Sequence, residues 1–251
     1  MTRSTENEPS TQTQLAEPRS VQLIAGYRPQ RIVSGVVITG LSLFAVFELF
    51  RMGVGVLAMH GSGVFNGGQA DPELKDLALL AYVFAALPQL LLGLPVIVFY
   101  CIWVYRSAVN ARALGAGGFQ FSPGWAVGWY FIPIACLWMP YKAMSEIIRA
   151  SRPALPFTDS TAWWDIRTGP ILPLWWATWI IGHAIARIGH TLWQDRIGIG
   201  LDAIGASMIP IGHAIRGVAA VLCCVLINRV TVDQRTRAHR ITSEAGQELL
   251  G

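Results

Sequence analysis

The chain has 251 residues, of which 53% are hydrophobic and only 14% are charged, and its mean hydropathy is +0.45. Soluble domains are about 25% charged, so this composition excludes an ordinary water-facing fold. The 19 Lys and Arg against 15 Asp and Glu give a net charge of +4, but the basic residues lie mostly between or beyond apolar runs. That distribution encodes membrane topology and argues against a nucleic-acid partner.

The apolar runs predict an all-α, polytopic helical membrane bundle. We expect residues 1–31, which are polar and rich in Thr, Gln and Pro, to form a disordered cytoplasmic tail. Residues 32–230 form the predicted membrane domain, because four runs reach the roughly 20 residues that a spanning helix needs. A polar C-terminal tail, 231–251, follows this domain. The predicted spans are 32–59, 77–105, 169–193 and 201–228.

Residues 122–148 are apolar but interrupted by Pro133 and Pro140. If this segment does not cross the membrane, fourteen Lys and Arg lie on the side of the N-terminus, and only Lys75 and Arg196 lie opposite. If the segment does cross, the bias disappears. The positive-inside rule therefore favours four full spans with a cytoplasmic N-terminus and a half-inserted, re-entrant or interfacial segment. Five spans remain the alternative, because the segment is long enough to cross as one kinked helix.

The central part of the chain resembles a known bacterial family. After WVYRSAVN come a glycine and the string SPGWAVGWYFIPIACLWMPYKAMSEIIRAS, and this pattern resembles the domain of unknown function family numbered 4328. The resemblance implies a multi-pass protein of the bacterial plasma membrane and supplies no catalytic residue. Cys136 stands where the family commonly has Asn, so we expect a different group to satisfy the broken helix there. The motif positions are Arg106, Asn110, Gly115, Ser122, Pro123, Gly124, Trp125, Pro133, Trp138, Pro140, Trp175 and Trp176, and the resemblance extends to Arg187, Thr231 and Gln234.

A short internal repeat places one histidine in each arm of the last predicted helical hairpin. The repeat reads IGHAIAR at 181–187 and IGHAIRG at 211–217. With a rise of about 1.5 Å per residue, His183 and His213 lie at similar depth and could face one another. One interpretation is a proton relay or a pH-gated element. The other is a neutral pair that hydrogen-bonds across an interface of small residues.

Charges inside the predicted spans require partners. Counting from the ends of the runs puts Glu48 and Arg187 at matching depths, so we predict an ion pair between them. A local pair between Glu48 and Arg51 is the alternative. We expect Arg216 to lie nearer the cytoplasmic side and to reach a lipid phosphate.

Basic and aromatic residues gather at the predicted cytoplasmic edge. They could bind anionic lipid head groups, or they could serve only topology and interfacial anchoring. These residues are Arg106, Arg112, Lys142, Arg149, Arg152, Trp163 and Trp164.

Motifs of hydrolases, nucleotide-binding loops and zinc peptidases do not occur in the sequence. Arg187 shares a helical face with His183 and would repel a cation, so we expect no metal and no cofactor. The sequence favours a non-enzymatic membrane protein that is structural, lipid-interacting or accessory to an envelope complex. A small transporter or channel that uses Glu48, His183, Arg187 and His213 as a polar path is the alternative.

Overall fold

The computed structural model describes residues 26–61, 63, 69, 71–156, 159–194 and 201–250. Four long helices dominate this part of the chain, and no strand occurs in it. All four are long and apolar enough to cross a membrane, as the four-span prediction requires. Residues 1–25 of the expected tail, and the predicted turn at Gly198 and Gly200, lie outside the described residues. The helices are α2 (Arg31–Gly61), α3 (Pro72–Ala113), α6 (Ile171–Trp193) and α7 (Asp202–Leu250).

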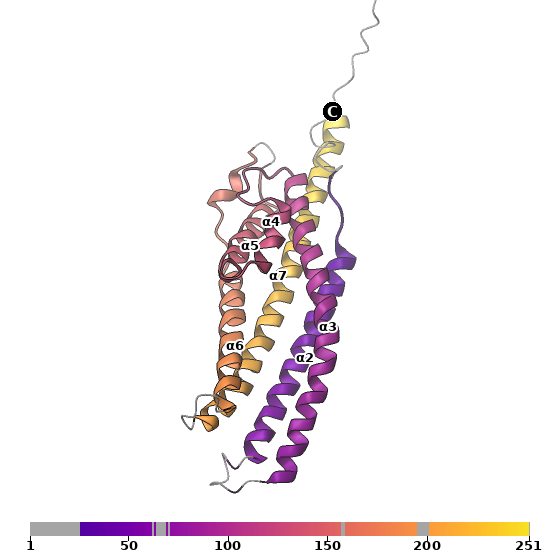
Figure 1. Ribbon diagram of the computed structural model, residues 1–251. Helices are drawn as coiled ribbons and strands as arrows, with labels where there is room; N and C mark the ends of the chain where they lie inside the picture. The colour runs from indigo at the N-terminus through magenta and orange to yellow at the C-terminus, as the bar shows by residue number, and fades with distance from the viewer. Residues whose placement is uncertain are drawn as a thin grey trace, which may run out of the picture.

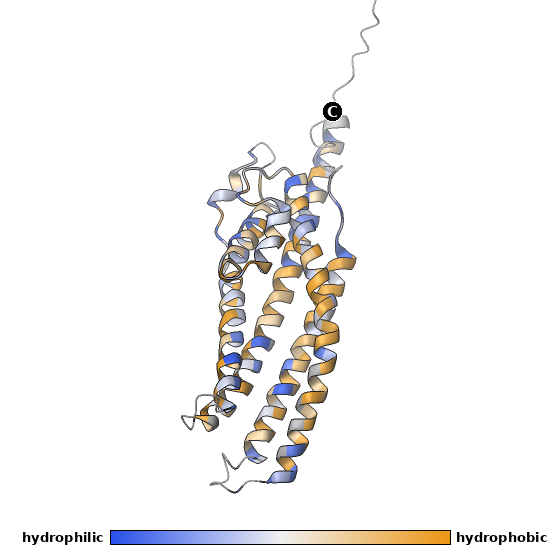
Figure 2. Ribbon diagram, viewed as in Figure 1, coloured by the Kyte–Doolittle hydropathy of each residue, from blue (hydrophilic) through white to orange (hydrophobic). Residues whose placement is uncertain are grey.

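The long helices stand side by side in the order α6, α7, α2, α3 (Figure 1). α2 and α6 run in one direction, and α3 and α7 return in the other, so the start of α2 and the end of α7 lie at the same end of the bundle. We call this the terminal end and the opposite one the distal end. Figure 2 shows apolar positions along the shafts of the helices, interrupted by a few hydrophilic ones in the distal half.

The proline-broken segment forms no spanning helix. It consists of α4 (Pro123–Gly128), two 3-10 turns, η1 (Trp129–Phe131) and η2 (Ala135–Leu137), and α5 (Met139–Ala150). α5, the longest piece, has 12 residues, well short of the roughly 20 needed to cross. The pieces cover the terminal end of the bundle (Figure 1). The segment therefore folds as predicted for four spans, and the five-span alternative is wrong.

Ile134 marks the sharpest break in this segment. Its φ of 69° and ψ of −57° place it at the centre of a γ-turn, in which the Ala135 N–H donates to the Pro133 carbonyl at 2.8 Å. A positive φ strains a β-branched residue. Backbone hydrogen bonds hold the chain on either side of the turn: the Cys136 N–H donates to the Ile132 carbonyl at 2.9 Å, and the Leu137 N–H donates to the Ile134 carbonyl at 3.0 Å.

Several family-motif residues are helix-end signals. Gly115 has a φ of 89° and directly follows the C-cap of α3. The Gly115 N–H donates to the Arg112 carbonyl and the Ala116 N–H to the Ala111 carbonyl, which is a Schellman motif. Ser122 caps α4 by accepting from the Trp125 N–H at 3.3 Å, with Pro123 in the first turn.

The predicted polar tail at 231–251 is largely helical, because α7 continues without a break to Leu250. Gln234 and Arg237 are each 1% exposed, as is Ile241. The hydropathy pattern predicted that the last span ends where the first polar residues occur. In the structure α7 continues beyond that point because its polar part is buried against α3 and α5.

α6 and α7 approach closely through glycines. A Cβ added to Gly212 would lie 2.7 Å from the Ala186 nitrogen, and one added to Gly205 would lie 2.3 Å from the Trp193 nitrogen. The predicted interface of small residues is therefore present. It brings the two backbones into direct contact.

Candidate functional site: a buried ion cluster beneath a lateral cavity

Glu48 is the centre of a buried polar cluster in the distal half of the bundle. Its carboxylate is 0% exposed and has partners on two other helices. Oε2 lies 2.6 Å from His213 Nδ1, and Oε1 lies 2.7 Å from Arg216 Nη2. Gln89 of α3 donates its amide N–H to Oε1 at 2.7 Å. The cluster therefore joins α2, α3 and α7.

Arg51 and His190 extend this cluster. The Arg51 guanidinium donates to the Gln89 side-chain oxygen, so Arg51 reaches Glu48 through Gln89. The His190 ring of α6 lies edge-on to the His213 ring, with 6.5 Å between centroids.

The predicted ion pair between Glu48 and Arg187 is wrong. Arg187 is exposed on α6, whereas Glu48 binds His213 and Arg216 of α7. The local pair between Glu48 and Arg51 is also replaced by the bridge through Gln89. Equal depth brings two residues to the same level, but the rotation of each helix decides which residues meet.

The expectation that Arg216 reaches a lipid phosphate is wrong as well. Arg216 binds Glu48, and its guanidinium carbon lies 5.5 Å from the centre of the Phe44 ring.

The 31 residues of α2 extend about 46 Å at 1.5 Å per residue, whereas the hydrocarbon core is only about 30 Å thick. Counting from a helix end therefore misplaces a residue by the unknown length of the overhang.

The two repeat histidines are close in depth but do not face one another. Gly182 packs against Arg216, and Gly212 against Ala186, so His183 lies near the level of the residues that flank His213. The His183 ring nevertheless packs on Trp179, at 4.1 Å between centroids, with Nδ1 2.8 Å from the Trp179 carbonyl oxygen. The hydrogen bond predicted across the interface is replaced by the contacts of His213 with Glu48 and His190.

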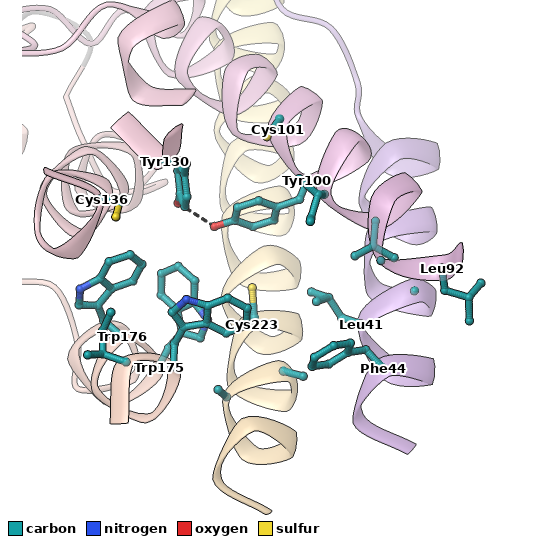
Figure 3. A pocket seen from close by; sticks show the side chains of 18 of the residues that line it. Leu41, Phe44, Leu92, Tyr100, Cys101, Tyr130, Cys136, Trp175, Trp176 and Cys223 are labelled. Carbon is teal, nitrogen blue, oxygen red and sulfur yellow. Dashed lines mark hydrogen bonds between the residues drawn. The ribbon is translucent and has the colours of Figure 1, made fainter. Parts of the chain in front are cut away.

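A cavity of about 470 Å³ lies between α3 and α6. α2 and α7 line its sides and back, and η1 and η2 line it from the terminal end (Figure 3). Its wall is almost entirely apolar and strongly aromatic. Prominent lining residues are Phe44, Tyr100, Tyr130, Trp175, Trp176 and Trp179.

Polar groups occur at both ends of the cavity. At the terminal end, the Tyr100 and Tyr130 hydroxyls are 2.9 Å apart, and Figure 3 shows the two rings pointing toward one another. Toward the distal end, Gln89 lines the cavity and also belongs to the Glu48 cluster. Cys101, Cys136 and Cys223 line the cavity, whereas Cys224 contacts the Ile38 carbonyl.

This cavity is not lined by the four residues of the transporter alternative, Glu48, His183, Arg187 and His213. Gln89 connects the cavity to the Glu48 cluster. Glu48 and His213 are both 0% exposed. Within the described residues, no group of three or more His, Cys, Asp or Glu is placed to hold a metal ion.

A second buried network at the terminal end contains the family-motif residue Asn110. Asn110 accepts from the Arg28 N–H at 3.0 Å and donates to the Arg28 carbonyl at 2.9 Å, which fixes the chain as it enters α2. Gln234 donates to Ser151 Oγ and to the Ser107 carbonyl, both at 2.9 Å. Gln30 donates to Gln234 at 3.1 Å. The network therefore joins α2, α3, α5 and α7.

Other motif residues hold the broken segment in place. The Trp176 indole donates to the Leu137 carbonyl at 2.8 Å, which ties the broken segment to α6. Trp125 packs on Trp129, with 4.9 Å between centroids. Trp175 is buried and lines the cavity, whereas Trp138 is 43% exposed. Arg106 is half-buried.

Part of the basic edge is engaged inside the protein. Arg112 donates to the Phe121 carbonyl and lies 4.0 Å from the centre of the Phe119 ring. Glu146 of α5 accepts from the backbone N–H groups of Gln120 and Phe121 at 3.1 and 3.4 Å. Burial raises the pKa of Glu146, although these two hydrogen bonds oppose the shift. Arg149 lies 5.1 Å from the centre of the Trp163 ring.

The family model for the domain of unknown function 4328 (DUF4328) matches residues 67–232. The chain belongs to this family. No curated protein and no solved structure matches the chain. The DUF4328 region contains most of the cavity wall and the His213 and Arg216 side of the ion cluster. α2, which supplies Glu48, precedes the matched region.

Sequence reasoning missed three important groups. Gln89 is the only amide side chain in the long uncharged run 77–105, and its position next to Pro88 was an available signal. Tyr100 and Tyr130 were not singled out, since one lies in a span and the other in the broken segment. Only the fold brings their hydroxyls together.

Proposed function

We propose that this chain is a non-enzymatic, multi-pass membrane protein that binds a lipid in the cavity between α3 and α6. The cavity itself carries the proposal. At about 470 Å³ it lies within the roughly 300–1,000 Å³ typical of small-molecule sites, which are mostly apolar with few polar groups.

The composition of the cavity wall supports an apolar occupant. Water would bind poorly in the cavity because almost no polar atoms line the wall. In a bilayer, hydrocarbon chains are the most abundant material that could fill the space.

We propose further that the protein lies in the bacterial plasma membrane with its N-terminus in the cytoplasm. Most basic residues belong to the terminal end, including Lys142, Arg149, Arg152 and Arg240, whereas Lys75 begins α3 at the distal end. The positive-inside rule assigns the terminal end to the cytoplasm. Exposed members of this edge, such as Lys142, would contact anionic head groups, and the proposal includes no nucleic-acid partner.

The test blocks the cavity and counts bound lipid. Gly93 lines the cavity, and a Cβ there meets no atom within 4 Å, so Gly93→Phe can fill it. Gly53 also has open space around it but does not line the cavity, so Gly53→Phe is the matched control. Native mass spectrometry after mild delipidation should find one lipid fewer on Gly93→Phe than on the wild-type protein and the control. Equal lipid retention by all three proteins would contradict lipid binding in the cavity.

A further inference from the structure

The hydroxyls of Tyr100 and Tyr130, at the terminal end of the cavity, have one hydrogen-bond donor that their mutual contact does not use. Each hydroxyl carries one O–H, and the 2.9 Å contact uses only one of the two. Neither hydroxyl makes another hydrogen bond among the described residues. Both tyrosines line the cavity. A ligand there would therefore meet one free O–H donor in otherwise apolar surroundings.

The shape of the cavity favours a single hydrocarbon chain. Its wall on α3 extends from Gln89 to Cys101, a length of about 18 Å at 1.5 Å per residue. The wall is almost entirely apolar over this length. The cavity is therefore elongated and apolar, as a site for a hydrocarbon chain must be.

The tyrosine pair lies at the end of the cavity nearest the charged residues of the terminal end. Tyr100 is six residues before Arg106 on α3, or about 9 Å from it along the helix axis. An ester carbonyl next to a head group at the terminal end could therefore reach the free O–H. From there the apolar wall continues past Phe44 and Leu92 toward Gln89. The amide of Gln89 is already bonded to Glu48 and Arg51.

We propose that the cavity binds one acyl chain of a membrane glycerolipid, with the ester carbonyl accepting the free hydrogen bond of the Tyr100 and Tyr130 pair. This inference rests on the proposed lipid-binding function. It names the chemistry that the site recognises: an ester carbonyl at the terminal end and an acyl chain that extends toward Gln89. The lipid comes from the leaflet at the terminal end.

A matched pair of lipids tests the role of the carbonyl. 1-Palmitoyl-lysophosphatidylcholine and 1-O-hexadecyl-lysophosphatidylcholine share the head group and chain length, but only the first has an ester carbonyl. The reporter is the alkylation rate of Cys136, which lines the cavity, by a membrane-permeant maleimide. The protein carries Cys101→Ala, Cys223→Ala and Cys224→Ala so that Cys136 is the only thiol.

We expect the ester lipid to protect Cys136 at a concentration about fivefold lower than the ether lipid, as one hydrogen bond would give. Either single Phe variant keeps one hydroxyl that can donate, so Tyr100→Phe and Tyr130→Phe should each retain part of this preference. The double variant should lose it, while the ether lipid still protects at its wild-type concentration. That last result shows that the cavity of the double variant is intact.

The outcomes separate the two proposals. Equal protection by both lipids in the wild-type protein, or an ester preference that persists in the double Phe variant, would overturn the carbonyl assignment and leave lipid binding standing. If neither lipid protects Cys136 and Gly93→Phe retains as much lipid as the wild-type protein, the proposed function fails as well.

Discussion

At the scale of single residues, the Glu48 cluster shows how a membrane bundle accommodates charge. The Glu48 carboxylate is fully buried, and its two oxygens contact His213, Arg216 and Gln89. A buried ion pair adds little net stability, because desolvation offsets most of the attraction. The loss of one partner is different, since it leaves the remaining charges buried without compensation. The cluster therefore specifies which faces of α2, α3 and α7 meet.

We predict that Glu48→Ala lowers the free energy of unfolding by about 3–5 kcal/mol, because it leaves the Arg216 charge without its carboxylate. Arg187→Ala is the control, since Arg187 is exposed and its loss should change stability by less than about 0.5 kcal/mol. Unfolding in mixed detergent micelles, followed by circular dichroism, measures both changes. A larger effect at Arg187 than at Glu48 would favour the pairing predicted from the sequence over the observed one.

At the scale of elements, direct backbone contact fixes the α6 and α7 hairpin. Gly189 and Gly205 bring the helices so close that a Cβ added to Gly205 would lie 2.7 Å from the Gly189 carbonyl oxygen. Membrane helices gain no hydrophobic energy from meeting one another, so this close packing supplies much of their attraction. The broken segment shows the opposite case, because Pro133 and the strained Ile134 prevent a helix and leave η1 and η2 to close the cavity.

Gly205→Ala should force α6 and α7 apart and lower the free energy of unfolding by about 1–3 kcal/mol, as overpacking does in close-packed interiors. Gly53→Ala is the matched control, because its Cβ meets no atom within 4 Å. It should be neutral or stabilise the protein by up to about 1 kcal/mol through helix propensity. Thermal unfolding of both variants in the same detergent makes the comparison. Equal stability of the two would show that the hairpin tolerates separation.

At the scale of the whole molecule, four long helices and a broken cap place both ends of the described chain at one end of the bundle (Figure 1). The cavity is a consequence of this arrangement. α6 packs on α7, α7 on α2 and α2 on α3, so the helices form an open arc with a lateral space between its first and last members. Figure 3 shows aromatic side chains of α6 facing α2 across that space.

Thiol labelling checks this topology in a chain whose four native cysteines are replaced by Ala. Cysteine reporters replace four exposed residues: Gln69, Gln120, Gln194 and Gln247. We expect an impermeant maleimide to label positions 69 and 194 in intact cells, and positions 120 and 247 only after permeabilisation. A crossing by the broken segment would instead expose position 247 and hide position 194. Labelling of 120 and 247 alone would reverse the proposed orientation.

The sequence by itself determined the class of protein and the four spans, and it favoured, without deciding, a segment at 122–148 that does not cross. These properties depend on run length, proline position and the distribution of basic residues, which local chemistry decides. The family motif was equally readable, and several of its residues act locally: Gly115 ends α3 and Ser122 begins α4. The tertiary structure alone decided which polar residues meet. The rotation and overhang of each helix pair Glu48 with Arg216 instead of Arg187, and they bring Tyr100 to Tyr130. The rotation and the overhang of a helix cannot be predicted from the spacing of residues along the sequence, because both result from packing the four helices together.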